Sequence, residues 1–172
     1  MLSLDTLVTL QKAISYVAIA LLVVAVYSDV RTFRIPNLLV LAIAVLGVTR
    51  LMLLGSPIAA IYAVGAILLI FAVGFLLFSR GFIGGGDVKL LLATILLIRY
   101  PDLFKFFMRM GIFGVVLSVA VILRNYVPIG PRVTPLSRRT VPYGVAIAAA
   151  GIMTILLQPL LFGYAISLPS FL

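Results

Sequence analysis

The sequence predicts an all-α membrane protein, a single bundle of about six transmembrane helices that forms one domain over residues 1–172. Apolar residues make up 65% of the chain and charged residues 10%. Soluble domains contain about 45–50% apolar and about 25% charged residues. The mean hydropathy is +1.35. Polar side chains are too few to cover an aqueous surface, so lipid must be the solvent for most of the chain. This composition excludes a soluble enzyme.

Six apolar runs define the expected transmembrane helices. In order, they cover about residues 13–28, 36–54, 57–78, 87–100, 106–123 and 141–157. The third run carries no charge and is long enough for a bilayer core of ~30 Å at ~1.5 Å per residue. The second run contains Arg50 near one end, where we expect its long side chain to reach the headgroups.

The fourth run is too short to cross the bilayer core. Only 13 residues separate Asp87 from Pro101, which corresponds to roughly 20 Å of helix. We therefore expect Asp87 to lie beneath the headgroups. Beyond the sixth run, Pro159 interrupts an apolar tail over residues 158–172, which we interpret as a partial or re-entrant segment.

Cations in the connections predict the orientation, because short loops rich in Lys and Arg stay in the cytoplasm. One side of the bundle holds eight of them: Arg31, Arg34, Arg80, Lys89, Arg124, Arg132, Arg138 and Arg139. The other side holds five: Lys12, Arg50, Arg99, Lys105 and Arg109. This bias places the N-terminus outside and brings Asp29 and Asp87 to the cytoplasmic face. Asp5 and Asp102 are then expected on the opposite side, as solvated loop acids.

The residue types that are absent narrow the chemistry. The chain has no His, Cys, Trp or Glu, and its four acids are Asp5, Asp29, Asp87 and Asp102. The usual zinc sites and the Ser-His and Cys-His nucleophiles are therefore excluded, and we expect no metal and no cofactor. The net charge of +9 comes from cations scattered singly between apolar runs, so nucleic acid is not an expected partner.

Two of the four acids are candidates for catalysis, because an acid at the membrane edge of an apolar helix is costly and usually functional. Asp29 follows the first run and Asp87 begins the fourth. If these helix ends pack together, the carboxylates share one proton, since both cannot ionise side by side. The ionised partner would take a proton from a water that attacks a peptide carbonyl, and the protonated partner would polarise that carbonyl. Such a pair is an aspartic dyad.

The residues around the two acids have predicted supporting roles. Gly84, Gly85 and Gly86 allow unusual backbone angles and the close approach of an extended substrate. Pro36 suits the first turn of the second helix, and Asn37 is expected to cap that helix or to bond across the loop.

Three cations near the predicted dyad have two interpretations. Arg31, Arg34 and Lys89 either anchor the topology at the headgroups, or they hold substrate and tune the dyad.

Three motifs occur together in the chain: Asp29 followed by Ile35-Pro36-Asn37, then Gly84-x-Gly86-Asp87-x-Lys89-Leu90, then Pro142-Tyr143-Gly144 before the last helix. In this combination the chain resembles the prepilin peptidase family of membrane aspartic proteases, the G-x-G-D class. The resemblance spans most of the chain and implies that Asp29 and Asp87 are catalytic. It also implies cleavage of the short basic leader from type IV prepilins. The third motif is weak support, because the family often has a second Pro where Val145 stands here.

The resemblance narrows to one branch of that family. Larger bacterial members carry an N-terminal cytoplasmic region with a cysteine-rich zinc site, and they also methylate the new pilin N-terminus. Here the first span is expected near Ala13 and there is no Cys, so the chain is similar to the short, peptidase-only branch of tight-adherence (Flp-type) pili. Methyltransferase activity is not expected.

The implied partner is a prepilin precursor in the bacterial inner membrane. Its basic leader ends in Gly and is followed by a hydrophobic N-terminal helix with an early Glu. Archaeal preflagellin peptidases share the same motif, so they are a variant within the same class of enzyme.

Three other functions remain open on the same residues. A proton-coupled transporter also places acids in membrane helices, but usually near the midplane instead of one edge. A noncatalytic pilus-assembly subunit would require neither acid. A serine–lysine protease would use Ser28 or Ser79 as nucleophile and Lys89 as base, although a neutral Lys needs burial and Lys89 has the cytoplasmic face within reach.

Overall fold

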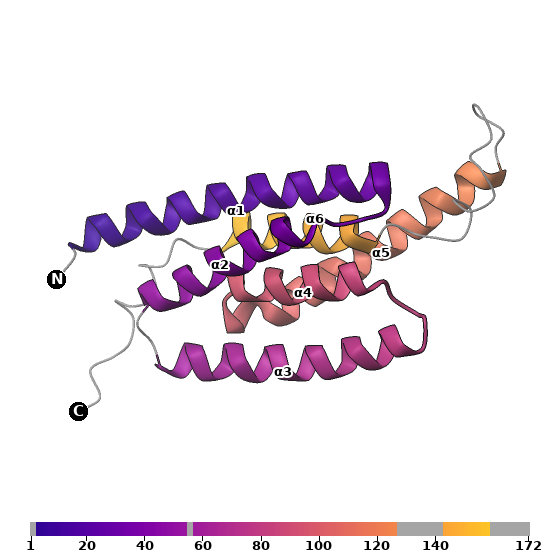
Figure 1. Ribbon diagram of the computed structural model, residues 1–172. Helices are drawn as coiled ribbons and strands as arrows, with labels where there is room; N and C mark the ends of the chain where they lie inside the picture. The colour runs from indigo at the N-terminus through magenta and orange to yellow at the C-terminus, as the bar shows by residue number, and fades with distance from the viewer. Residues whose placement is uncertain (1–2, 55–56, 127–142, 159–172) are drawn as a thin grey trace.

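The computed structural model describes residues 3–54, 57–126 and 143–158, and this part of the chain is helical, with no strand in it (Figure 1). Its elements are α1 (Leu4–Thr32), α2 (Asn37–Leu54), α3 (Pro57–Ser79), α4 (Gly85–Leu97), the 3-10 helix η1 (Tyr100–Asp102), α5 (Leu103–Tyr126) and α6 (Tyr143–Leu157). Among the described residues, three stretches are long and apolar enough to cross a membrane: Asp5–Thr32, Ala60–Ser79 and Tyr100–Leu123. The predicted all-α membrane protein is confirmed.

Helix α1 is longer than its apolar run, because it includes charged residues at both ends. It begins after Ser3, whose hydroxyl accepts the Thr6 N–H at 3.2 Å as a helix cap. Asp5 therefore lies in the first helical turn, where it is exposed, and not in a loop. At the other end the helix continues to Thr32 and stops at Phe33, which has the left-handed φ of 51°. Asp29 consequently stands in the last turn of α1.

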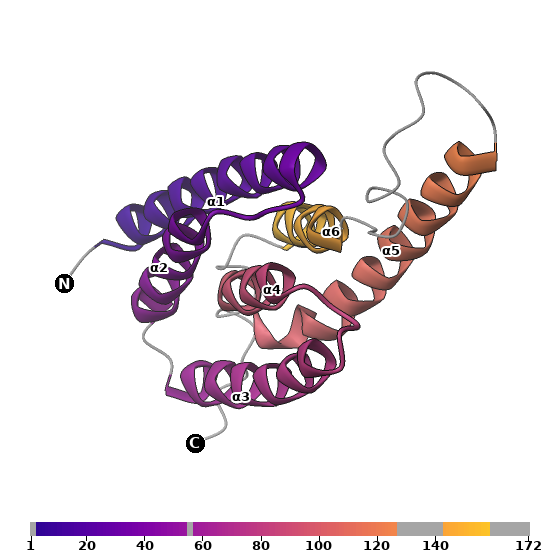
Figure 2. The same cartoon turned by 45° about the vertical axis from the view of Figure 1, so that its right-hand side comes forward.

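The short helix α4 forms the centre of the bundle. It packs against α2, α3 and α6, while α1 packs against α2 and α6 (Figure 2). Six of its side chains are buried: Val88, Leu90, Ala93, Thr94, Ile95 and Leu97. A Cβ on Gly47 of α2 would overlap the Leu96 side chain, so glycine permits the close approach of these two helices.

The outer helices present large apolar side chains outward, as a lipid environment requires. On α3, for example, Leu68 and Leu69 are both mostly exposed, as are Val115 and Val116 on α5. Two sequence predictions lie outside the described residues. They concern the tail beyond Gln158 and the connection that carries Arg132, Arg138 and Arg139.

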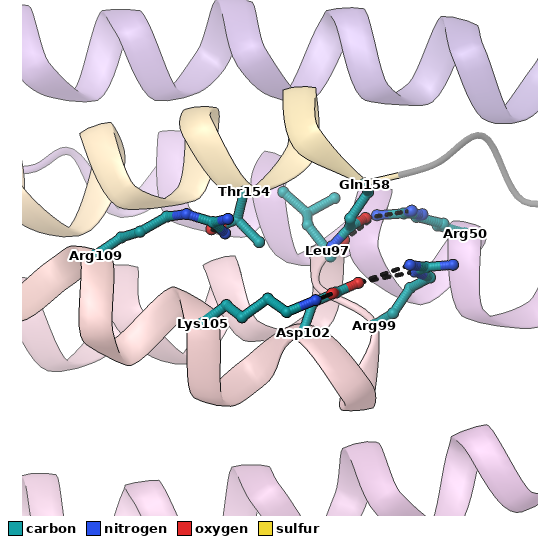
Figure 3. A network of polar contacts seen from close by, with 8 residues as sticks. All are labelled: Arg50, Leu97, Arg99, Asp102, Lys105, Arg109, Thr154 and Gln158. Carbon is teal, nitrogen blue, oxygen red and sulfur yellow. Dashed lines mark hydrogen bonds and ion pairs between the residues drawn. The ribbon is translucent and has the colours of Figure 1, made fainter.

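Arg50 does not reach out to the headgroups as predicted; it is buried, with 5% of its surface exposed. Its guanidinium donates to the backbone carbonyl of Leu97 and to Gln158 Oε1 at 2.8 Å (Figure 3). It also donates to Gln11 Oε1 at 3.3 Å. The reason is that α4 ends inside the protein, where its last carbonyls have no water to accept from. Arg50 supplies the missing donors.

Asp102 is also not the solvated loop acid that the sequence predicts. It is buried, and it pairs with Arg99 at 2.7 Å and with Lys105 at 3.2 Å (Figure 3). Because α4 is short, the segment that follows it is drawn into the bundle, and the buried carboxylate needs these cations. Arg109 donates to Thr154 at 3.0 Å and joins α5 to α6 at the same end.

Replacement of Arg50 by Leu is expected to destabilise the protein. The change leaves the Leu97 carbonyl and two glutamine side chains without their donor, so we expect the free energy of unfolding in detergent to fall by about 3 kcal/mol. Arg80→Leu is the control, because Arg80 is exposed at the opposite end of the bundle. Equal thermal stability of the two variants would show that the Arg50 contacts contribute nothing.

Candidate active site

The last turn of α1 and the first turn of α4 lie at the same end of the bundle, at the right of Figure 1. Successive helices alternate in direction, so the end of α1, the start of α2, the end of α3 and the start of α4 meet there. The fold thus brings Asp29 and Asp87 together, although 57 positions separate them in the sequence. Both acids therefore lie at the same end of the bundle.

Asp87 occupies the third position of α4, directly after the glycine run. Gly84 is the N-cap residue, and its carbonyl accepts the Asp87 N–H at 3.1 Å. The Asp87 carboxylate turns back toward Gly84, the direction that an acid takes in a capping box. The unpaired N–H groups at a helix N-terminus favour this negative charge.

The glycine run also allows close packing around Asp87. A Cβ on Gly85 would lie 3.2 Å from the Phe78 ring, and one on Gly84 would lie 3.1 Å from Asp87 Oδ2. A Cβ on Gly86 would lie 3.9 Å from the Ile35 Cβ, an ordinary van der Waals distance. Gly84 and Gly85 therefore give room to the ring and to the carboxylate, which larger residues would displace.

Asp29 is buried, with 4% of its surface exposed, and its partner is the N-terminus of α6. Its Oδ2 accepts the Val145 N–H at 3.1 Å. The Gly144 backbone lies directly against the same carboxylate. A Cβ on Gly144 would lie only 2.6 Å from Asp29 Oδ2. Glycine is required here because α6 must approach the carboxylate with bare backbone.

Both acids line one cavity of about 650 Å³. The predicted residues Arg34, Asn37, Gly84, Gly85, Gly86 and Lys89 also line it. Phe33, Ile35, Gly81, Phe82, Ile83 and Tyr143 complete the wall. We call this the catalytic cavity, for the role that we propose for its two acids. It combines two carboxylates, two cations and an amide on a partly apolar surface.

Lys89 and Asn37 connect the two motifs directly. The Lys89 ammonium donates to Asn37 Oδ1 at 3.2 Å, so Asn37 has a partner on α4 that the sequence did not predict. The contact joins the start of α2 to the first turns of α4. It orients Asn37 and Lys89 on the same wall of the catalytic cavity.

Pro36 and Arg31 do not line the catalytic cavity. Pro36 stands just before α2, and its carbonyl accepts the N–H groups of Leu39 and Val40, so its role is to start the helix. The Arg31 guanidinium lies over the Tyr27 ring, 5.0 Å from its centre.

The serine–lysine arrangement is not present in the described residues. The Ser28 hydroxyl donates to the Arg34 carbonyl at 2.8 Å, and the Ser79 hydroxyl donates to the Leu76 carbonyl at 2.9 Å. Lys89 donates to Asn37 instead of a serine. Each hydroxyl therefore stabilises a loop or a helix end.

Gly144 is the site residue that sequence analysis undervalued. Its motif was weak support because Val145 stands where the resembled family often has a second Pro. The sequence signal for Gly144 is a Tyr-Gly pair at the start of an apolar helix. Its role becomes apparent only from the packing of α6 on α1.

The fold and site define a membrane protein with two convergent aspartates, and comparison with known families agrees. The type IV leader peptidase family matches residues 16–119, a segment that contains both Asp29 and Asp87. The chain belongs to this family and is therefore a peptidase. Comparisons with curated proteins and with solved structures give no match.

Replacement of Gly144 by Ala tests the contact between α6 and Asp29. The new Cβ would overlap Asp29 Oδ2 and lie 2.9 Å from Ile35 Cδ1, so we expect a loss of about 1–3 kcal/mol in the free energy of unfolding. Gly65→Ala is the matched control, since a Cβ there meets nothing within 4 Å. Thermal unfolding in detergent measures both. An unchanged Gly144→Ala variant would contradict the close approach.

Proposed function

We propose that the protein is an aspartic endopeptidase that removes the short basic leader from type IV, Flp-like prepilins at the cytoplasmic face of the inner membrane. The observation that supports this most is the shared cavity, in which α1 and α4 bring Asp29 and Asp87 together. Membership of the leader peptidase family supports the reaction class. The excess of cations on the side of the two acids supports the cytoplasmic orientation.

The two carboxylates act as one unit that holds a single proton. The ionised carboxylate takes a proton from a water molecule, and the resulting hydroxide attacks the carbonyl carbon of the scissile peptide bond. The protonated carboxylate polarises the carbonyl oxygen during the attack. As the carbon–nitrogen bond breaks, a proton passes from the dyad to the leaving amine. The reaction requires no metal, no cofactor and no covalent intermediate.

The backbone around the dyad supports these roles of the ionised and the protonated carboxylate. The N-terminus of α6 donates to Asp29, and the N-terminus of α4 surrounds Asp87. Backbone donors of this kind stabilise a carboxylate without contributing a proton that can transfer. They hold both acids in place while the proton moves between water, dyad and substrate.

The cations of the catalytic cavity give it a preference for an acidic group on the substrate. Arg34 and Lys89 both line the cavity. In the proposed complex, Arg34 pairs with the early Glu of the prepilin helix, because an Arg–carboxylate pair is strong and directional. A preflagellin precursor is the alternative substrate of the same class. Methyl transfer is not part of the proposal.

Substitution of either aspartate by Asn should abolish cleavage. Asn cannot accept or donate the catalytic proton, so we expect Asp29→Asn and Asp87→Asn each to lower kcat by at least about 1000-fold. The assay incubates a candidate prepilin with membranes or detergent-solubilised enzyme and reads the new N-terminus by mass spectrometry. Asp5→Asn is the control, because Asp5 is exposed and does not line the cavity.

The same assay can also contradict the two-carboxylate mechanism. Near-normal turnover by either folded Asn variant would refute the two-carboxylate mechanism and reopen the transporter, assembly-subunit and serine–lysine alternatives.

Substitution of Arg34 by Gln should weaken substrate binding more than chemistry. We expect KM for the precursor to rise about tenfold with a smaller change in kcat, since one charged hydrogen bond contributes about 1.5–3 kcal/mol. A precursor with Gln in place of its early Glu should lose this sensitivity. Arg80→Gln is the control, because Arg80 is exposed and outside the cavity. Equal KM values for Arg34→Gln and wild type would exclude the contact.

A further inference from the structure

The catalytic cavity offers no acidic side chain outside the dyad to the cations of a basic leader. The chain has four acids in all, and two of them form the proposed dyad. Asp102 pairs with Arg99 and Lys105. Asp5 stands in the first turn of α1, about 36 Å of helix away from Asp29. Neither acid can pair with a leader that lies at the dyad.

The dyad itself is a poor partner for a cation. Its two carboxylates share one proton in the proposed mechanism, and Arg34 and Lys89 line the same cavity. Two positive charges therefore accompany one negative charge, which disfavours the approach of further cations. A basic leader needs a surface that attracts cations although it carries no charge. The faces of aromatic rings have this property.

Two phenylalanines in the wall of the catalytic cavity provide such rings. Phe33 lies in the loop between α1 and α2, and Phe82 lies in the loop between α3 and α4, at the same end of the bundle (Figure 1). Their exposed fractions are 44% and 69%. A cation already lies over an aromatic ring nearby, because the Arg31 guanidinium covers the Tyr27 ring. Phe33 and Phe82 leave their rings open to a ligand in the cavity.

The backbone at Phe33 is strained for any residue with a Cβ. Its φ of 51° lies in the left-handed region, where glycine is the usual residue at a helix end. The Phe33 N–H donates to the Asp29 carbonyl at 2.9 Å, and the Ser28 hydroxyl donates to the Arg34 carbonyl at 2.8 Å. These bonds hold the loop in its shape. A strained, half-exposed side chain in a cavity wall is a candidate for function.

The turn before Phe82 also leaves its ring exposed. The Gly81 N–H donates to the Phe78 carbonyl and the Phe82 N–H donates to the Leu77 carbonyl, both at 2.9 Å. With Gly81 at a φ of 75°, the turn is a Schellman motif, in which the residue after the glycine commonly packs on its own helix. Phe82 is mostly exposed instead. Closure of α3 therefore does not account for this aromatic residue.

We propose that Phe33 and Phe82 bind the cationic side chains of the leader through their ring faces and so select a basic leader. This inference rests on the proposed function. Both residues share the cavity with Asp29 and Asp87, so their rings lie beside the bond to be cut. Arg34 takes the early Glu in the same complex, and the rings take the leader cations. Charge then orients the substrate across the dyad.

Anchoring in the headgroup region is the competing role for exposed rings at a membrane edge. An anchor faces lipid, whereas Phe33 and Phe82 line the cavity that holds both aspartates. The two roles also differ in their consequences. An anchor affects the cleavage of every leader equally, whereas a cation contact affects only leaders that carry Lys or Arg.

Replacement of Phe33 by Gly separates binding from folding. Glycine relieves the left-handed backbone, so the variant should unfold at about the same temperature as the wild type. We expect its KM for a basic-leader prepilin to rise about fivefold, as the loss of one cation–π contact predicts. Phe82→Leu should have the same effect, and Phe33→Tyr should restore the wild-type KM. Phe104→Leu is the control, because Phe104 is exposed and outside the cavity.

The same variants are assayed with a prepilin whose leader Lys and Arg are replaced by Gln. The KM of Phe33→Gly and of Phe82→Leu should then equal that of the wild type. Equal losses with the basic and the neutral leader would assign the rings to anchoring and overturn the proposal, as would unchanged KM values with the basic leader. Failure of the wild type to cleave either precursor would instead refute the proposed function.

A tryptophan at Phe33 supplies a readout that does not depend on turnover. The chain has no Trp, so Phe33→Trp in the Asp87→Asn background carries a single fluorescent reporter. A synthetic basic leader peptide should change its fluorescence saturably, and the Gln-substituted peptide should bind at least about fivefold more weakly. Phe104→Trp in the same background should respond to neither. Equal affinity of Phe33→Trp for the two peptides would overturn the cation contact.

Discussion

The contact between Arg50 and the C-terminal carbonyl of α4 is the interaction on which the arrangement of the bundle depends. Helix α4 has 13 residues, so it ends within the protein, where lipid cannot satisfy its free backbone groups. Arg50 from α2 donates to the Leu97 carbonyl at that end, and Gln158 after α6 accepts from Arg50. At its other end, the glycine run and Asp87 occupy the first turn. A short central helix fixed at one end can present its first turn at a constant depth.

The second constraint is the approach of α6 to Asp29. A buried carboxylate in an apolar bundle needs donors, and α6 supplies them from its backbone without any side chain. Gly144 makes this possible because any larger residue would overlap the carboxylate. The proposed catalytic pair therefore has three supports, from α1, α4 and α6, although only the first two contribute acids. The arrangement explains why a helix distant in sequence belongs to the site.

These two constraints also separate the polar and apolar regions of the protein. Polar groups gather at the two ends of α4, around Asp87 at one end and around Arg50 and Asp102 at the other. Between them, the cavity among α3, α4, α5 and α6 has an almost entirely apolar lining. The two aspartates lie at one end of the bundle because they stand in the last turn of α1 and the first turn of α4.

The sequence by itself determined the class of protein, the six helices and the two aspartates, because composition and apolar runs depend on local residues alone. It also indicated the glycine run and the Asn37 motif, whose residues lie next to the acids. It failed for Arg50 and Asp102, since a charge near the end of an apolar run is explained equally well by headgroups and by a buried partner. Only the tertiary structure decided between them, because the partners lie on other helices. The role of Gly144 also depends on the tertiary structure, because the absence of a Cβ matters only when the group packed against it is known.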